Sequence, residues 1–129
     1  MKINNGWPPN IEKIQQIFDL SNRKPVFTFG DTIYNPYGFD IPEHLFVHES
    51  VHAQQQSNPS EWWARYLKDS EFRLSQELEA YRKQYQYAAR TIKNREVLFR
   101  FLHTIAKDLS SEMYGYIINY EDAIKQIKQ

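Results

Sequence analysis

PEHLFVHESVHAQQQ, residues 42–56, is the segment around which the rest of this chain has to be arranged. Pro42 suits the first turn of a helix, and we expect that helix to run to about Gln56. His48 and His52 are four residues apart, so they lie on one helix face, one turn apart, and both imidazoles can point at one metal ion. Glu49 lies about 100° around the helix from His48 and flanks that face.

This H-E-x-x-H pattern predicts different roles for the histidines and for Glu49. The two neutral nitrogens would hold the metal, and Glu49 would take a proton from a water bound to it, as metal-assisted hydrolysis requires. We therefore predict Glu49 to be a general base and not a ligand. The alternative is a surface helix with two histidines that bind nothing.

A hydrolytic zinc ion needs three protein ligands and one open position. His44 shares the face of His48 and His52, but three ligands on one straight helix would span roughly 12 Å, too far for one ion. We expect His44 to lie beside the site. His103 falls among Phe101, Leu102 and Ile105 and is predicted to be a partly buried packing histidine.

Glu77 is the predicted third ligand. On a helical wheel it lies with an apolar stripe formed by Leu74, Leu78, Tyr81, Tyr85 and Ala88. Burial of an unpaired carboxylate is costly, so Glu77 needs a partner, which a metal would supply. The alternative partner is Arg73, one turn earlier. Glu79 lies about 200° away on the wheel and is predicted to be a salt-bridge residue on the solvent face.

The pairing of His48-Glu49-Ser50-Val51-His52 with Glu77-Leu78-Glu79-Ala80 resembles the gluzincin zinc metallopeptidases, the group typified by thermolysin. In that group a second helix brings a glutamate to the zinc held by the first. The resemblance implies that His48, His52 and Glu77 are the zinc ligands and that Glu49 is the general base. The resemblance covers about residues 26–81. In its size the chain resembles the minimal single-domain gluzincin-like proteins found in phages and bacteria.

The chain departs from that family at one position. Many members write the second motif as E-x-x-A-D, and the aspartate supports a zinc-binding histidine. Here Tyr81 stands in its place. A phenol can accept a histidine N–H hydrogen bond but brings no charge, so the support must be weaker or differently built.

The resemblance also implies a substrate-binding strand before the first zinc helix. In thermolysin-like enzymes an extended substrate adds to the edge of such a strand, and residues 32–34 are the candidate here. The alternative is a hairpin that only covers the core. An electrophile for the oxyanion is also required, and the sequence leaves four candidates open: Tyr81, His103, Tyr114 and Tyr116.

Local patterns predict a mainly helical α+β fold with one small hairpin over residues 26–34. We expect a helix from Asn10 to about Leu20, one that begins at Asn58-Pro59, a long one from Ser70 to about Arg90, and others opened by Asn94 and Asn119. Trp62, Trp63 and Tyr66 follow helical spacing and are predicted to fill the core.

The composition excludes several classes of protein for this chain. The 129 residues include 16 basic and 16 acidic side chains and no cysteine. The length suits one domain over residues 1–129. Lack of cysteine excludes a disulfide scaffold and a thiolate zinc finger. No apolar stretch approaches the ~18–20 residues that span a bilayer, and no signal segment is evident, so we expect no membrane partner and a cytoplasmic location.

Residues 82–107 are rich in Lys and Arg, and Tyr85 and Tyr87 lie between these basic side chains. A helix that binds nucleic acid through this stretch is therefore a further alternative. A net charge of zero argues against nucleic acid as a partner, and a solvated helix face is the simpler interpretation.

We therefore expect a zinc-dependent hydrolase, a metallopeptidase that acts on a peptide or protein substrate. Two alternatives remain open: a regulatory protease specific for one partner protein, and a non-catalytic zinc-containing binding or structural module. The sequence names neither the substrate nor the oligomeric state.

Overall fold

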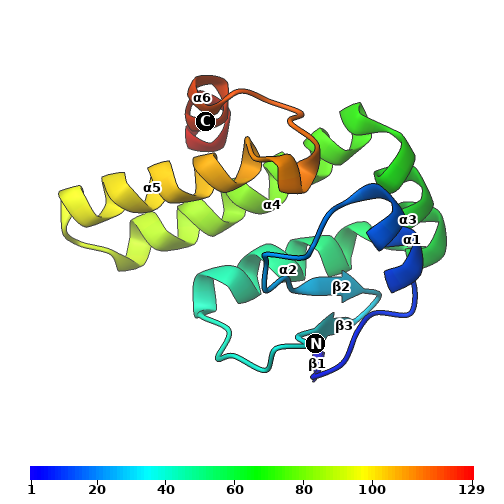
Figure 1. The fold of residues 1–129 in the computed structure, drawn as a ribbon. Helices are drawn as coiled ribbons and strands as arrows, with labels where there is room; N and C mark the ends of the chain where they lie inside the picture. The colour runs from blue at the N-terminus through cyan, green and yellow to red at the C-terminus, as the bar shows by residue number, and fades with distance from the viewer.

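The computed structural model describes residues 1–129 and confirms a mainly helical α+β fold (Figure 1). None of its helices is both long and apolar enough to cross a membrane. In chain order the elements are β1 Lys2–Asn4, α1 Ile11–Ile17, β2 Phe27–Phe29, β3 Thr32–Tyr34, α2 Glu43–Gln55, α3 Pro59–Lys68, α4 Ser70–Thr91, α5 Arg95–Leu109, a 3₁₀ turn Glu112–Tyr114 and α6 Tyr120–Lys128.

Side-chain caps start most of the helices where the sequence places them. Asn58, Asn94 and Asn119 each accept a backbone N–H of the first turn of α3, α5 and α6, as predicted. The prediction for α4 was wrong by one residue, because Asp69 and not Ser70 accepts the Phe72 N–H, at 3.1 Å.

The first helix is shorter than predicted and is not capped by Asn10. The side chain of Asn10 makes no capping hydrogen bond. α1 ends at Ile17 because Phe18 turns into extended backbone, with φ −119° and ψ 137°. This turn lets the Phe18 ring pack edge-on against Tyr66 in the core.

The predicted hairpin is confirmed, but it belongs to a three-stranded sheet. β2 and β3 pair antiparallel, with Thr28 opposite Ile33, and Gly30 in the turn has a φ of +66°. β1, which the sequence patterns did not predict, pairs parallel with β3. The strand order is β1-β3-β2. Both edges of β3 are therefore occupied, and the expectation that an extended substrate adds to residues 32–34 was wrong.

The outer edge of β2 is held by side chains. The Thr28 carbonyl accepts hydrogen bonds from Gln56 Nε2 and Trp63 Nε1, both at 2.9 Å. The amide oxygen of Gln56 accepts the Gly30 N–H at 2.8 Å. The Gln56 amide thus takes the place of a neighbouring strand and ties the sheet to the end of α2.

Helix α2 lies between the sheet and α4, with α5 and α6 on the far side of α4 (Figure 1). Two apolar clusters flank this arrangement. One joins α4, α5, the 3₁₀ turn and α6: Tyr81, Leu102, Ile105, Ala106, Leu109, Tyr114, Ala123 and Ile127. The other joins α1, β2 and α3 and confirms the predicted core aromatics: Ile14, Phe18, Phe27, Trp62, Trp63, Tyr66 and Leu67.

Arg73 on α4 is buried and links three segments. Its guanidinium donates to the carbonyls of Tyr66, Leu67 and Tyr114, at 2.8, 3.0 and 3.0 Å. The carbonyls of Tyr66 and Leu67 lie in the last turn of α3, where backbone carbonyls would otherwise lack hydrogen-bond donors. All three donated bonds go to the backbone and none to Glu77, so the alternative in which Arg73 neutralises Glu77 was wrong.

Replacement of Arg73 should be severely destabilising. In Arg73→Leu the three carbonyls lose their donors in a buried setting, and we expect a loss of about 3 kcal/mol or more in the free energy of unfolding. Urea denaturation measures this. Arg100→Leu, which removes only an exposed ion pair with Glu96, is the matched control and should change stability by about 0.5 kcal/mol or less. Equal losses in the two variants would contradict the role given to Arg73.

Candidate metal centre

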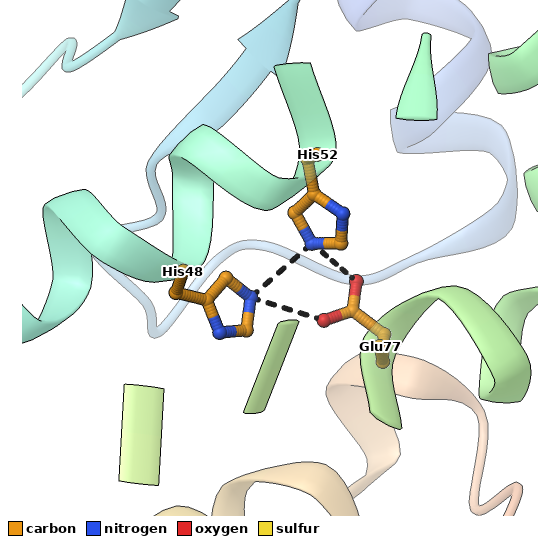
Figure 2. A group of neighbouring side chains, drawn as sticks. All are labelled: His48, His52 and Glu77. Atoms are coloured by element: carbon orange, nitrogen blue, oxygen red, sulfur yellow. Dashed lines mark hydrogen bonds and ion pairs between the residues drawn. The ribbon is translucent and has the colours of Figure 1, made fainter. Parts of the chain in front are cut away.

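Two helices bring three predicted ligands together. His48 and His52 point from α2 toward Glu77 on α4 (Figure 2). The two histidine Nε2 atoms are 3.2 Å apart. Glu77 Oε1 lies 3.2 Å from Nε2 of His48, and Oε2 lies 3.2 Å from Nε2 of His52. The predicted grouping of these three side chains is therefore what the structure shows.

The three side chains are buried, with exposed fractions of 3%, 5% and 3% for His48, His52 and Glu77. Tyr66 donates its hydroxyl to Glu77 Oε2 at 2.6 Å. Glu77 Oε1 is also buried; it lies against Nε2 of His48 but makes no hydrogen bond with it or with any other group. A buried carboxylate oxygen without a donor is costly, and a cation is the partner that would satisfy it.

The cluster could hold a metal ion. Two ligands about 2.0–2.1 Å from one tetrahedral ion are expected about 3.3 Å apart. The Nε2 atoms of His48 and His52 are 3.2 Å apart, and each lies 3.2 Å from a different oxygen of Glu77. Imidazole nitrogens and a carboxylate are also a common ligand set for divalent transition metals. Both the spacing and the chemistry of the residues thus fit a metal.

The charges in the cluster are strongly linked. Burial by itself lowers the pKa of His52, but the adjacent Glu77 carboxylate outweighs it and raises that pKa to about 9. Burial by itself raises the pKa of Glu77, but His52 and His48 outweigh it and hold that pKa far below its usual range. Without a metal, His52 is therefore a cation paired with the Glu77 anion at neutral pH.

Glu49 lies beside the cluster and outside the ligand group, as predicted. Its Oε2 is 3.8 Å from Nε2 of His48. Its Oε1 accepts the hydroxyl of Thr28 at 2.8 Å, so strand β2 holds this carboxylate in place. The second oxygen is left to face the cluster.

Two cavities meet at His48 and Glu49. The smaller, about 60 Å³, reaches His52 and Glu77 and has mainly apolar walls that include Phe18, Trp62 and Trp63. The larger, about 340 Å³, extends past Tyr81 and Gln84 to Arg23 and Asp108. Val26, Met113 and Tyr114 line both. Glu49, the candidate base, therefore lines both cavities.

Two of the four oxyanion candidates lie at the site. Tyr81 and Tyr114 share a hydrogen bond of 2.8 Å between their hydroxyls. Burial raises the pKa of each phenol well above its ordinary value, so both keep their protons at neutral pH. One of the two protons makes the shared bond, and the other is available to a group in the cavity.

The structure does not bring the other two candidates to the cluster. His103 packs against the rings of Phe99 and Tyr120 and is hydrogen-bonded to the Tyr120 hydroxyl. It lines neither cavity, which agrees with its predicted packing role. Tyr116 is 72% exposed and lines a separate groove between α4 and α6.

Two partners of the cluster were not predicted from the sequence. Nδ1 of His48 lies 2.9 Å from Gln84 Oε1, and Nδ1 of His52 lies 2.8 Å from Gln55 Oε1. The support of His48 is differently built, one of the two options that the sequence left open: the Tyr81 hydroxyl faces Tyr114, and only its ring contacts His48. A signal existed for Gln84: it follows Glu77 by seven residues, two turns on the same face.

Glu79 is exposed as predicted, but it forms no ion pair. It accepts a hydrogen bond from Gln55 Nε2 at 2.8 Å.

His44 stays outside the ligand group, as predicted, and its Nδ1 lies 2.9 Å from Gln84 Nε2. On the basic stretch, Arg82 is bonded to Gln126 and Tyr85 packs against the core, which weakens the case for a nucleic-acid face.

Comparison of the chain with protein-family models, curated proteins and solved structures gave no match.

The His52–Glu77 pair should make the stability of the metal-free protein depend on pH. The pKa of His52 rises from 6.5 in the unfolded chain to about 9 in the fold, so its contribution is complete below about pH 6.5 and is lost as the pH rises through about 9. Urea unfolding of chelator-treated protein between pH 6 and 10 should show this loss. Glu77→Gln removes the anion and should flatten the curve; an unchanged slope would contradict the pairing.

Proposed function

We propose that this chain is a zinc-dependent hydrolase, a gluzincin-like metallopeptidase in which His48, His52 and Glu77 hold Zn²⁺ and Glu49 is the general base. The observation that supports this most directly is the buried His–His–Glu cluster with a second, non-ligating carboxylate, that of Glu49, beside it at the junction of two cavities. A purely structural zinc site has no use for such a carboxylate or for a cavity.

Zinc is the metal that this ligand set favours. Two histidines and one glutamate are three protein ligands, the number typical of catalytic zinc sites, whereas structural sites use four and are rich in cysteine, which this chain lacks. When bound, the ion would polarise a substrate carbonyl and acidify a water molecule.

Glu49 would move the protons. One of its oxygens is held by the Thr28 hydroxyl, so the other is oriented toward the cluster and the cavities. There it can take the proton of an attacking water and deliver it to the amine that leaves when the peptide bond breaks. The bond to Thr28 limits rotation of the carboxylate, which keeps the accepting oxygen within reach.

Tyr114 is the best placed residue to stabilise the oxyanion. Its hydroxyl belongs to the pair with Tyr81, and its side chain lines both cavities. When Tyr81 donates and Tyr114 accepts, the remaining phenol proton can be donated to a carbonyl oxygen that gains negative charge. Arg73 holds the Tyr114 carbonyl and so positions this residue.

Zinc binding is the first test. Purified protein should hold about one zinc per chain, and His48→Ala or Glu77→Ala should abolish it at micromolar zinc, because each removes one of three ligands. Metal analysis after gel filtration measures this. His103→Ala, which alters a histidine away from the cluster, should retain the metal. A wild-type chain that takes up no zinc on titration would refute the proposal.

Turnover is the second test. Glu49→Gln keeps the size of the side chain and its acceptor for Thr28 but loses the basic oxygen. Peptide hydrolysis should fall by ~10²–10⁴-fold while zinc content and melting temperature stay near wild type. A peptide library of mixed sequence, with the products identified by mass spectrometry, presents many candidate cleavage sites in one reaction.

The matched control for Glu49→Gln is Glu43→Gln, an exposed acid at the start of the same helix, which should cleave like wild type. Equal cleavage by Glu49→Gln and wild type would rule out this mechanism. Zinc binding without cleavage by any of the proteins would favour a non-catalytic zinc module.

A further inference from the structure

The Nδ1 atom of each histidine in the cluster contacts the side-chain amide oxygen of a glutamine. Gln84 on α4 places its Oε1 2.9 Å from Nδ1 of His48, and Gln55 at the end of α2 places its Oε1 2.8 Å from Nδ1 of His52. Gln84 is buried, with an exposed fraction of 3%, and Gln55 is half-buried. Neither contact follows from the resemblance to the gluzincins.

The chemistry of imidazole sets the direction of the bond to His48. Nε2 of His48 faces Glu77 and His52, so a metal there would use its lone pair. In a neutral imidazole the proton must then be on Nδ1, and Nδ1 donates to Gln84 Oε1. The amide of Gln84 therefore has to present its oxygen to His48.

His44 holds the amide in that orientation. The NH₂ group of Gln84 lies 2.9 Å from Nδ1 of His44 and donates to it. A flipped amide would place NH₂ against the Nδ1–H of His48 and lose that hydrogen bond, and it would keep the bond to His44 only if His44 moved its proton from Nε2 to Nδ1. The His44 ring is itself fixed edge-on against Phe101, with the centroids 4.9 Å apart. Three side chains thus form a directed chain from His44 through Gln84 to His48.

We propose that Gln84 is the positioning residue of the metal centre and that His44 locks its amide, so that a neutral amide does here what a carboxylate does in the resembled family. This assignment rests on the proposed metal site. Charge explains the choice of an amide: the buried site already contains Glu49 and Glu77, and a third carboxylate would raise the cost of burying anions. A neutral acceptor also adds less basicity to His48 than a carboxylate would.

The test compares three variants with one control. Gln84→Leu removes the acceptor and should weaken zinc affinity by ~10–100-fold, the usual effect of losing a partner behind a metal ligand. Gln84→Glu restores an acceptor and should recover most of that affinity. His44→Phe removes only the lock and should weaken zinc less than Gln84→Leu. Gln86→Leu, at an exposed position of α4, is the control. Chelator competition measures the affinities.

Histidine NMR supplies a readout that a general packing effect would not produce. In zinc-loaded wild type, His48 should show a protected Nδ1–H, and His44 should be the Nε2–H tautomer. The His48 Nδ1–H signal should be lost in Gln84→Leu and kept in Gln84→Glu. In Gln84→Glu the carboxylate cannot donate, so His44 should acquire a proton on Nδ1.

The outcomes of these measurements separate the two claims. Zinc affinity in Gln84→Leu equal to that in Gln86→Leu, or no recovery in Gln84→Glu, would overturn the assignment and leave the proposed function standing. If Gln84→Leu fails to fold, an unchanged His44 tautomer in Gln84→Glu would overturn it. If wild type binds no zinc, both claims fail together.

Discussion

The negative charge of Glu77, enclosed between two histidines of another helix, is the constraint that the surrounding structure has to satisfy. A buried carboxylate is tolerated only with close polar or charged partners. Here they come from two helices: His48 and His52 from α2 and the hydroxyl of Tyr66 from α3. The contacts of α2 and α3 with α4 therefore converge on the Glu77 carboxylate, a candidate ligand of the metal centre.

Helix α4 carries three buried polar side chains along one side, and each of them has to be paired with groups of other elements. Arg73, Glu77 and Gln84 lie on the same side of the helix and are all buried. Arg73 bonds the end of α3 and the turn at Tyr114, Glu77 meets α2 and α3, and Gln84 reaches the first half of α2. A polar layer thus runs between the two apolar clusters, and its hydrogen bonds specify how the two halves meet.

The residues of the centre could be predicted because their spacing is local. His48 and His52 follow one helical turn, and Glu77 stands in an apolar stripe where a charge has to be explained. Helix starts at Asn58, Asn94 and Asn119 were equally readable, since a cap acts within three residues. The same reasoning placed Glu49 beside the ligands, and the hairpin followed from its β-branched and aromatic residues around a Gly-Asp turn.

Contacts between residues far apart in the chain were decided only by the tertiary structure. The sequence showed a hairpin, but β1 pairs with β3 across about thirty residues and makes β3 the central strand. Thr28 reaches Glu49, Gln84 reaches His48, and Arg73 reaches Tyr114 over sequence separations of 21, 36 and 41 residues. No local period encodes such pairings. Thus the sequence by itself determined most of the helices and the ligand types, while the fold decided which side chains hold them in place.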